Sequence, residues 1–117
     1  MALPGTKLRS PNDFMYLLLR EGNIKEFNVK KASGDKVDLR GCDFRNADLR
    51  ELQAEGLDFS DCYFRQADLR GVDFRGTNLE GASLNGAKIS GACFPKELSA
   101  EEIRLSVEHG TRLRYDA

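Results

Sequence analysis

Residues 37–96 read VDLRG, CDFRN, ADLRE, LQAEG, LDFSD, CYFRQ, ADLRG, VDFRG, TNLEG, ASLNG, AKISG, ACFPK when the chain is written in blocks of five. The third residue of every block is apolar, and the first residue is apolar in every block except the one that begins with Thr77. An amphipathic helix needs apolar residues three and four positions apart, and a half-buried strand needs strict alternation, so neither template describes this stretch. The blocks therefore indicate an internal repeat with a period of five residues.

A block with inward residues at its first and third positions fits a short extended piece followed by a turn. Four such blocks can close a square circuit of twenty residues. Circuits stacked at the usual interstrand distance of ~4.8 Å can then pair as parallel ladders along each side. The repeat predicts three circuits, at residues 37–56, 57–76 and 77–96. We therefore expect an all-β solenoid with the third residue of each block, such as Phe64, near its axis.

Glycine supports this reading because it often ends a block. A type II turn that begins at the third residue of a block places the fifth residue at positive φ, which glycine adopts without steric cost. No lysine-serine pair or dinucleotide fingerprint accompanies these glycines, so they are expected to form corners rather than a phosphate-binding loop. The glycines in the last place of a block are Gly41, Gly56, Gly71, Gly76, Gly81, Gly86 and Gly91.

The blocks resemble the pentapeptide repeat family, whose pattern is Ala-(Asp/Asn)-Leu-X-X, and AlaAspLeu occurs verbatim at residues 47–49 and 67–69. The resemblance implies a right-handed quadrilateral parallel β-helix, here of about three to four coils, with short N- and C-terminal capping helices. Departures are mild, since Ala54 is small and Tyr63 stands where the family has Asp or Asn. Family members are numerous in bacteria, cyanobacteria especially, and most have no assigned biochemical role.

The chain divides into three predicted parts. Residues 1–36 are expected to form an N-terminal capping helix and, over residues 22–36, a degenerate first coil. Residues 37–96 form the repeat, and residues 97–117 form a C-terminal capping helix and tail. A solenoid needs such caps because its terminal circuits would otherwise expose apolar side chains and unpaired backbone groups.

Local signals mark the ends of both capping helices. Ser10 followed by Pro11 indicates the start of the first helix, whose apolar residues 14–19 are expected to cover the first circuit. Ser99 lies three residues before Glu102, which is the spacing of a capping box, and Gly110 provides the stop signal.

Charged residues form columns at the outward positions. Asp precedes the third residue in six blocks and Arg follows it in six, and residues twenty apart are expected to share a side. One interpretation is a solvated surface, whose ion pairs contribute only about 0 to 1 kcal/mol each. The alternative is an arginine-rich face that binds an anionic partner. The candidate interaction residues are Arg45, Arg50, Arg65, Arg70, Asp48 and Asp68.

The remaining reactive side chains do not suggest catalysis. Cys42 and Cys62 occupy inward positions and are expected to be buried as small apolar side chains, while Cys93 lies at an outward position and is the more reactive candidate. His109 is the only histidine and is expected at a helix end, where the helix dipole favours a cation. Neither a CxxC pair nor a nucleophile elbow is present. We therefore expect no enzyme activity, no cofactor and no metal site.

The net charge is −1, with +3 on residues 1–36 and −2 on each of the other two parts, so direct nucleic-acid binding is not expected. No apolar run is long enough to span a membrane, and three cysteines suit a cytoplasmic protein. We predict a non-catalytic interaction or scaffold module that binds an unidentified protein.

The resemblance raises one alternative function, a DNA mimic that binds a type II topoisomerase such as DNA gyrase. Three circuits match only about four base-pair steps of ~3.4 Å, and the arginines break up an acidic surface. We expect a monomer, and the resemblance also leaves open a dimer formed through Ile103 and Val107 of the C-terminal helix.

Overall fold

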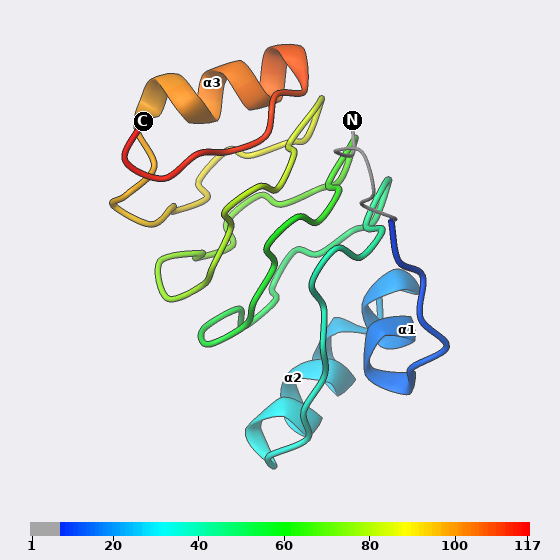
Figure 1. The fold of residues 1–117 in the computed structure, drawn as a ribbon. Helices are drawn as coiled ribbons and strands as arrows, with labels where there is room; N and C mark the ends of the chain where they lie inside the picture. The colour runs from blue at the N-terminus through cyan, green and yellow to red at the C-terminus, as the bar shows by residue number, and fades with distance from the viewer. Residues whose placement is uncertain (1–7) are drawn as a thin grey trace.

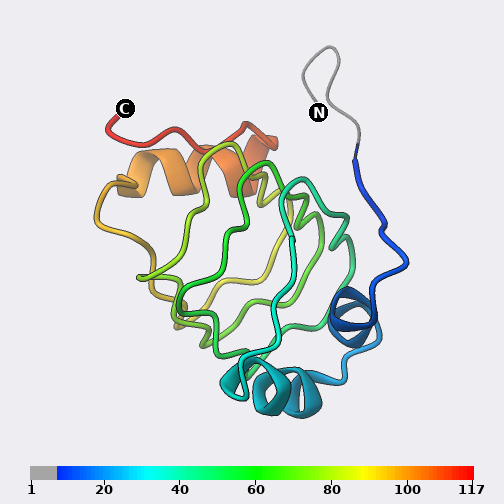
Figure 2. The same cartoon turned by 60° about the horizontal axis from the view of Figure 1, so that its bottom comes forward.

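The computed structural model describes residues 8–117. Its helices are α1 (Phe14–Arg20), α2 (Ile24–Ala32) and α3 (Ala100–His109). Figure 1 shows the repeat residues as stacked turns of chain, with α1 and α2 at one end of the stack and α3 at the other. The turned view in Figure 2 shows these turns winding around a shared interior.

Backbone contacts between the turns join residues twenty positions apart. Leu49 N donates to Asp68 O at 3.0 Å, and Asp68 N donates back to Ala47 O at 2.9 Å. Each contact is an isolated bridge, and within residues 8–117 no run of paired residues forms a strand or a sheet. The turn in each block leaves too few residues for a longer ladder. The bridges of this register are Asp43 with Tyr63, Tyr63 with Ser83, Asp48 with Asp68, Asp68 with Lys88, Asp58 with Asn78, and Asp73 with Cys93.

The corners follow the predicted positions, with one exception. The N–H of the first residue of a block donates to the carbonyl of the third residue of the block before, as from Cys42 N to Leu39 O at 3.2 Å. The fifth residue has positive φ at most corners, including Glu51 at 70°, where the side chain makes this conformation unfavourable. Positive φ was also expected at Gly76, and that expectation is wrong. At this corner the Thr77 hydroxyl donates to Phe74 O at 2.7 Å.

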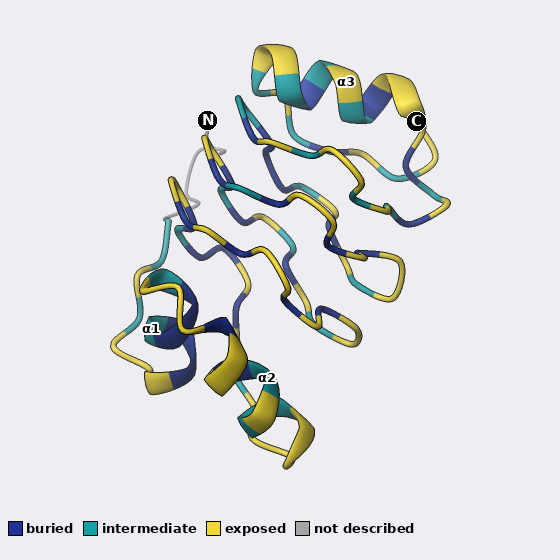
Figure 3. Cartoon of the chain, turned by 180° about the vertical axis from the view of Figure 1, so that it is seen from behind, coloured by how far each residue is buried: buried dark blue, intermediate teal, exposed yellow. Residues whose placement is uncertain are grey.

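The side chains at the third position of each block form the core. Those from Leu39 to Leu84 are all buried, as the repeat predicts, whereas Ile89 and Phe94 at the α3 end are only half-buried. The twenty-residue register stacks Phe44 on Phe64, with ring centroids 5.5 Å apart and an interplanar angle of 9°. Figure 3 shows the resulting alternation of buried and exposed residues along each turn.

Helix α1 covers the first turn, although it begins later than Ser10 and Pro11 indicate. Asp13 caps it, because its carboxylate accepts from the backbone N–H of Met15 at 2.9 Å and of Tyr16 at 3.2 Å. The Tyr16 ring lies 5.4 Å from Phe44, and its hydroxyl donates to Asp43 O at 2.6 Å. These contacts place α1 against the first turn, where the sequence predicted a cap.

Residues 22–36 do not form the predicted degenerate coil, because they contain α2. Ile24, Phe27 and Val29 continue the spacing of the repeat backward, but in α2 only Ile24 and Phe27 share the buried face, whereas Val29 is 66% exposed. The Asn28 amide then donates to Glu51 O and accepts from Gln53 N, both at 3.0 Å, and so covers part of the first turn. Residues 1–7 of the predicted N-terminal part lie outside the described residues.

Helix α3 has the predicted ends. The Ser99 hydroxyl accepts from Glu102 N at 3.1 Å, and Gly110 ends the helix at a φ of 74°. The Glu102 carboxylate binds Arg114 of the tail, with Nη2 at 2.8 Å. The tail was expected only to follow the helix, yet Leu113 is fully buried against the last turn. No helix within residues 8–117 has the length and apolar character needed to cross a membrane.

Candidate functional site

Most of the predicted charged face is built from one local unit, an Asp and the Arg two residues later. Asp48 Oδ1 accepts from the backbone N–H of Arg50 at 3.1 Å and from its Nε at 3.0 Å, and Asp48 Oδ2 accepts from Nη2 at 2.7 Å. The backbone bond holds the aspartate in the turn, and the bidentate ion pair fixes the guanidinium above it. The same three hydrogen bonds join Asp38 to Arg40, Asp43 to Arg45, Asp68 to Arg70, and Asp73 to Arg75.

Four of the candidate residues form one network across two turns. Arg50 Nε lies 3.4 Å from Asp68 Oδ2, so this guanidinium contacts the carboxylates of both Asp48 and Asp68. The hydrogen bond from Arg70 lowers the pKa of Asp68 to about 2, and that from Arg50 lowers the pKa of Asp48. The structure therefore brings Asp48, Arg50, Asp68 and Arg70 together as a chain of alternating charge.

The other two candidates lie in an adjacent column. Asn46 N donates to Arg65 O at 2.8 Å, which places Arg65 one turn beyond Arg45. Arg45 is held by Asp43, whereas Tyr63 occupies the corresponding position before Arg65. Among residues 8–117 the Arg65 side chain makes no ion pair, because the substitution by Tyr63 removes the carboxylate that would hold it.

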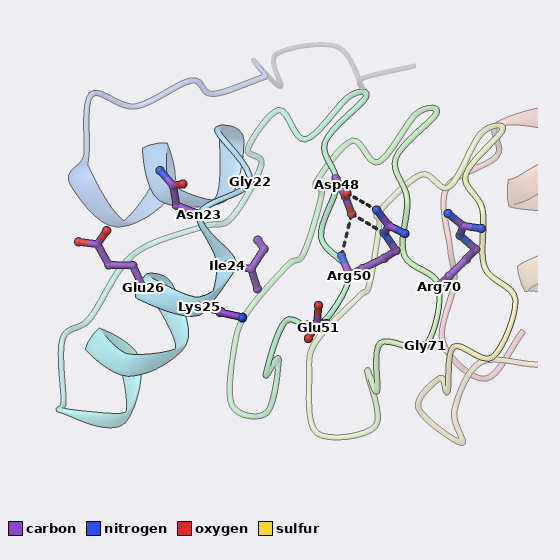
Figure 4. A pocket seen from close by; sticks show the side chains of 10 residues that line it. All are labelled: Gly22, Asn23, Ile24, Lys25, Glu26, Asp48, Arg50, Glu51, Arg70 and Gly71. Carbon is purple, nitrogen blue, oxygen red and sulfur yellow. Dashed lines mark hydrogen bonds and ion pairs between the residues drawn. The ribbon is translucent and has the colours of Figure 1, made fainter.

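A groove of about 790 Å³ separates the start of α2 from the network (Figure 4). Arg50 and Arg70 line its repeat side, and Lys25 lies on the α2 side. Sequence reasoning missed the contribution of α2, since it assigned residues 22–36 to a coil. The basic lining residues are balanced by three acidic ones, Glu26, Asp48 and Glu51.

This arrangement suits binding better than proton transfer. A general base at neutral pH needs a pKa near 7, and the pKa values of Asp48 and Asp68 are shifted the other way. The ion pairs occupy Nε and Nη2 of Arg50 and Arg70, and within residues 8–117 neither Nη1 has a hydrogen-bond acceptor. These two Nη1 groups are therefore free to donate further hydrogen bonds from a fixed position.

The cysteines divide as expected. Cys42 and Cys62 are buried and Cys93 is exposed, and none of the three forms a disulfide. Burial raises the pKa of Cys42 to about 11 and also raises that of Cys62, whose thiol donates to Leu39 O at 2.9 Å. In the described part of the chain, no group of three or more His, Cys, Asp or Glu side chains is arranged to hold a metal ion.

Comparison with known proteins identifies the repeat. The family model for pentapeptide repeats matches in 8 copies, over residues 18–51, 35–66 and 58–94. No curated protein and no solved structure matches the chain. The matched segments together run from residue 18 to residue 94, which is more than half of the sequence. The chain belongs to the pentapeptide repeat family.

Proposed function

We propose that this chain is a non-catalytic protein-interaction module, built as a right-handed four-sided β-helix of about three coils. The twenty-residue spacing of the parallel bridges and the buried third-position side chains support this architecture. Its regular outer faces provide extended surfaces of the kind that solenoid proteins use for binding. The module acts as a monomer in the cytoplasm, where its free cysteines stay reduced.

The proposed docking face consists of Arg45, Arg50, Arg65, Arg70, Asp48 and Asp68. The observation that supports it best is the Arg50 guanidinium, which contacts the carboxylates of Asp48 and Asp68 at the edge of the groove beside α2. A guanidinium fixed in this way loses little conformational entropy when it binds a further acceptor. The expected partner is a protein that presents carboxylate or carbonyl oxygens to this face.

The surface charge favours this function over topoisomerase binding by DNA mimicry. Mimicry requires a continuous acidic surface, whereas each aspartate of the network is paired with an arginine. A protein that recognises the alternating charges would bind both signs at once. Such recognition depends on the side chains of two successive turns, Asp48 with Arg50 and Asp68 with Arg70.

Affinity capture from native cytosol, followed by mass spectrometry, tests the proposal. The wild-type chain is compared with the Arg50→Gln, Arg70→Gln variant, and the matched control is Arg40→Gln, Arg75→Gln, which breaks two equivalent ion pairs elsewhere on the surface. We expect a specific partner that the control retains and the test variant loses. Equal capture by both variants would overturn the assignment of the face, and a topoisomerase among the captured proteins would favour mimicry.

A stability measurement accompanies this experiment. The four affected arginines are about half or more exposed, and exposed ion pairs contribute little. Both double variants should therefore lose less than about 2 kcal/mol of unfolding free energy in urea denaturation, since each exposed pair contributes about 0 to 1 kcal/mol. A much larger loss in the test variant would show that the network stabilises the fold instead of serving a partner.

A further inference from the structure

Among residues 8–117, part of the backbone edge of the turn nearest α3 has no hydrogen-bond partner. Between successive turns, most blocks present three groups to the next turn, the carbonyl of the first residue and the N–H of the third and fifth residues, although a few of these groups, such as Ala54 N and Gly76 N, have no backbone partner within residues 8–117. Cys42 O accepts from Tyr63 N at 3.1 Å, Phe44 N donates to Tyr63 O at 2.8 Å, and Asn46 N donates to Arg65 O at 2.8 Å. The four blocks of residues 77–96 have no following turn, so their groups need other partners.

The tail and α3 satisfy the first two of these blocks. In residues 77–81, the Tyr115 hydroxyl accepts from Leu79 N at 2.9 Å and donates to Thr77 O at 3.4 Å, while Gly81 N donates to Leu113 O at 2.8 Å. In residues 82–86, three more bonds complete the set. They join Leu113 N to Ala82 O at 2.8 Å, Leu84 N to Ser106 Oγ at 2.8 Å, and Gly86 N to Val107 O at 2.9 Å.

The corresponding groups of the last two blocks are unpaired. No residue between 8 and 117 forms a hydrogen bond with any of them. We call these six groups the open edge. They are Ala87 O, Ile89 N, Gly91 N, Ala92 O, Phe94 N and Lys96 N. An unpaired edge of this kind is a template for an added strand.

An apolar groove lies between the open edge and α3. Its volume is about 410 Å³, and its apolar lining comes from Ile89, Ala92, Phe94, Ile103 and Val107. Ile89 and Phe94 are the third-position side chains that the stack leaves half-buried. A side chain directed into this groove would complete the burial of both residues and gain about 25 cal/mol for each Å² of apolar surface removed from water.

The charges beside the open edge differ from those of the rest of the repeat. Lys88 and Lys96 are exposed, and within residues 8–117 neither forms an ion pair. Lys88 takes the outward position that Asp48 and Asp68 hold in the preceding turns. The open edge therefore combines unpaired N–H donors, an apolar groove and two lysines that complement acidic residues.

We propose that the open edge binds an extended peptide segment of a partner protein, with an apolar residue in the groove and acidic residues on either side. The tail of this chain shows the same mode on the neighbouring side of the stack. There Leu113 is fully buried, its N–H and carbonyl bond to the edge, and charged residues flank it. The proposal does not depend on the Arg50 face, because it uses other residues and other hydrogen bonds.

The test uses a library of random linear decapeptides displayed on phage and selected on the full chain. We expect enrichment of peptides that carry one large apolar residue between Asp or Glu residues. The best peptide should shift the amide resonances of Ile89, Gly91 and Phe94 in the ¹⁵N-labelled chain. The Lys88→Glu, Lys96→Glu variant should bind this peptide with a Kd about tenfold higher or more, which corresponds to about 1.4 kcal/mol of binding free energy.

The matched control is Lys30→Glu, Lys36→Glu, which makes the same charge change at solvent-accessible positions toward the other end of the stack and should bind the peptide like wild type. Enrichment of no peptide, or of peptides that shift only other amides, would overturn the proposal. Light scattering provides the remaining outcome. If the chain dimerises and the dimer protects the Ile89, Gly91 and Phe94 amides from hydrogen exchange, the open edge binds a second copy of the chain, and the peptide proposal is overturned.

Discussion

Replacement of Phe64 by Ala probes the packing that holds the turns together. The Phe64 ring is fully buried, stacks on Phe44 at 5.5 Å and meets Phe59 edge to face, also at 5.5 Å. Truncation of a buried Phe costs ~3–5 kcal/mol through lost apolar burial and the cavity left behind. Since a domain of this size has roughly 5–15 kcal/mol of stability in total, the variant should lose a large share of it.

The assay is thermal and urea unfolding followed by circular dichroism. A loss of about 4 kcal/mol corresponds to a decrease in Tm of roughly 15 °C for a chain of this length. Phe64→Asp should fail to fold, because it leaves an unpaired carboxylate in the core. The control is Phe14→Ala, since Phe14 is 58% exposed and its ring lies beneath Lys30, with Nζ 5.4 Å from the ring centroid.

The control should lose less than about 1 kcal/mol. A Phe64→Ala variant that unfolds within about 1 kcal/mol of the wild type would refute the assigned phase of the repeat, because only a side chain outside the core is so tolerant.

Three further predictions concern a corner, a carboxylate and a thiol. Gly71→Ala should lose about 1–2 kcal/mol in urea unfolding, because its φ is 75° and an added Cβ would contact nothing, so the loss is backbone strain alone. Gly76→Ala, at a corner without positive φ, should lose clearly less, because its closest contact would be the flexible Glu55 side chain, with Cγ at 3.2 Å, and equal losses would contradict the role of positive φ at these corners. The pKa of Asp68 is lowered to about 2 in the folded chain, so its contribution to stability is present above the unfolded pKa of ~3.9 and is lost as pH falls toward 2. The difference in Tm between wild type and Asp68→Asn should accordingly shrink between pH 6 and pH 2, and a constant difference would disprove the linkage. Cys93 is exposed, whereas burial raises the pKa of Cys62, so a thiol reagent should modify one cysteine rapidly. Cys93→Ser should abolish this rapid phase of modification. Rapid modification that persists in Cys93→Ser would show that the buried thiols are accessible.

The repeat made its own part of the structure predictable, because it encodes burial and turns within five residues. Phe44 and Phe64 stack because the sequence places them twenty apart, and Cys42 and Cys62 are buried for the same reason. The start of α3 was also predictable, since the Ser99 hydroxyl accepts a hydrogen bond from the N–H of Glu102, only three residues away.

The caps were less predictable because their contacts are distant in sequence. The spacing of Ile24 and Phe27 fits both a repeat and a helix. The helix forms, and it places Asn28 where its side chain bonds to Glu51 and Gln53 of the first turn. The spacing of three between the two buried residues was the signal that could have revealed α2.

The tail gave no such signal. Leu113 is an apolar residue flanked by Arg112 and Arg114, and its burial depends on hydrogen bonds to the backbone of Gly81 and Ala82, about thirty residues earlier in the chain. For the same reason, the open edge could not be inferred from the sequence. It lies where, within residues 8–117, neither α3 nor the segment after it forms a hydrogen bond with the backbone of residues 87–96.

Both proposed surfaces exist only if residues twenty apart are neighbours, so the register is the central claim to measure. NMR detection of scalar couplings across hydrogen bonds reports each N–H donor together with its carbonyl acceptor. The structure predicts couplings from Leu49 N to Asp68 and from Leu69 N to Lys88, with N to O distances of 3.0 and 2.9 Å. Couplings from these amides to carbonyls at any other separation would contradict the register, and both proposed surfaces would fall with it.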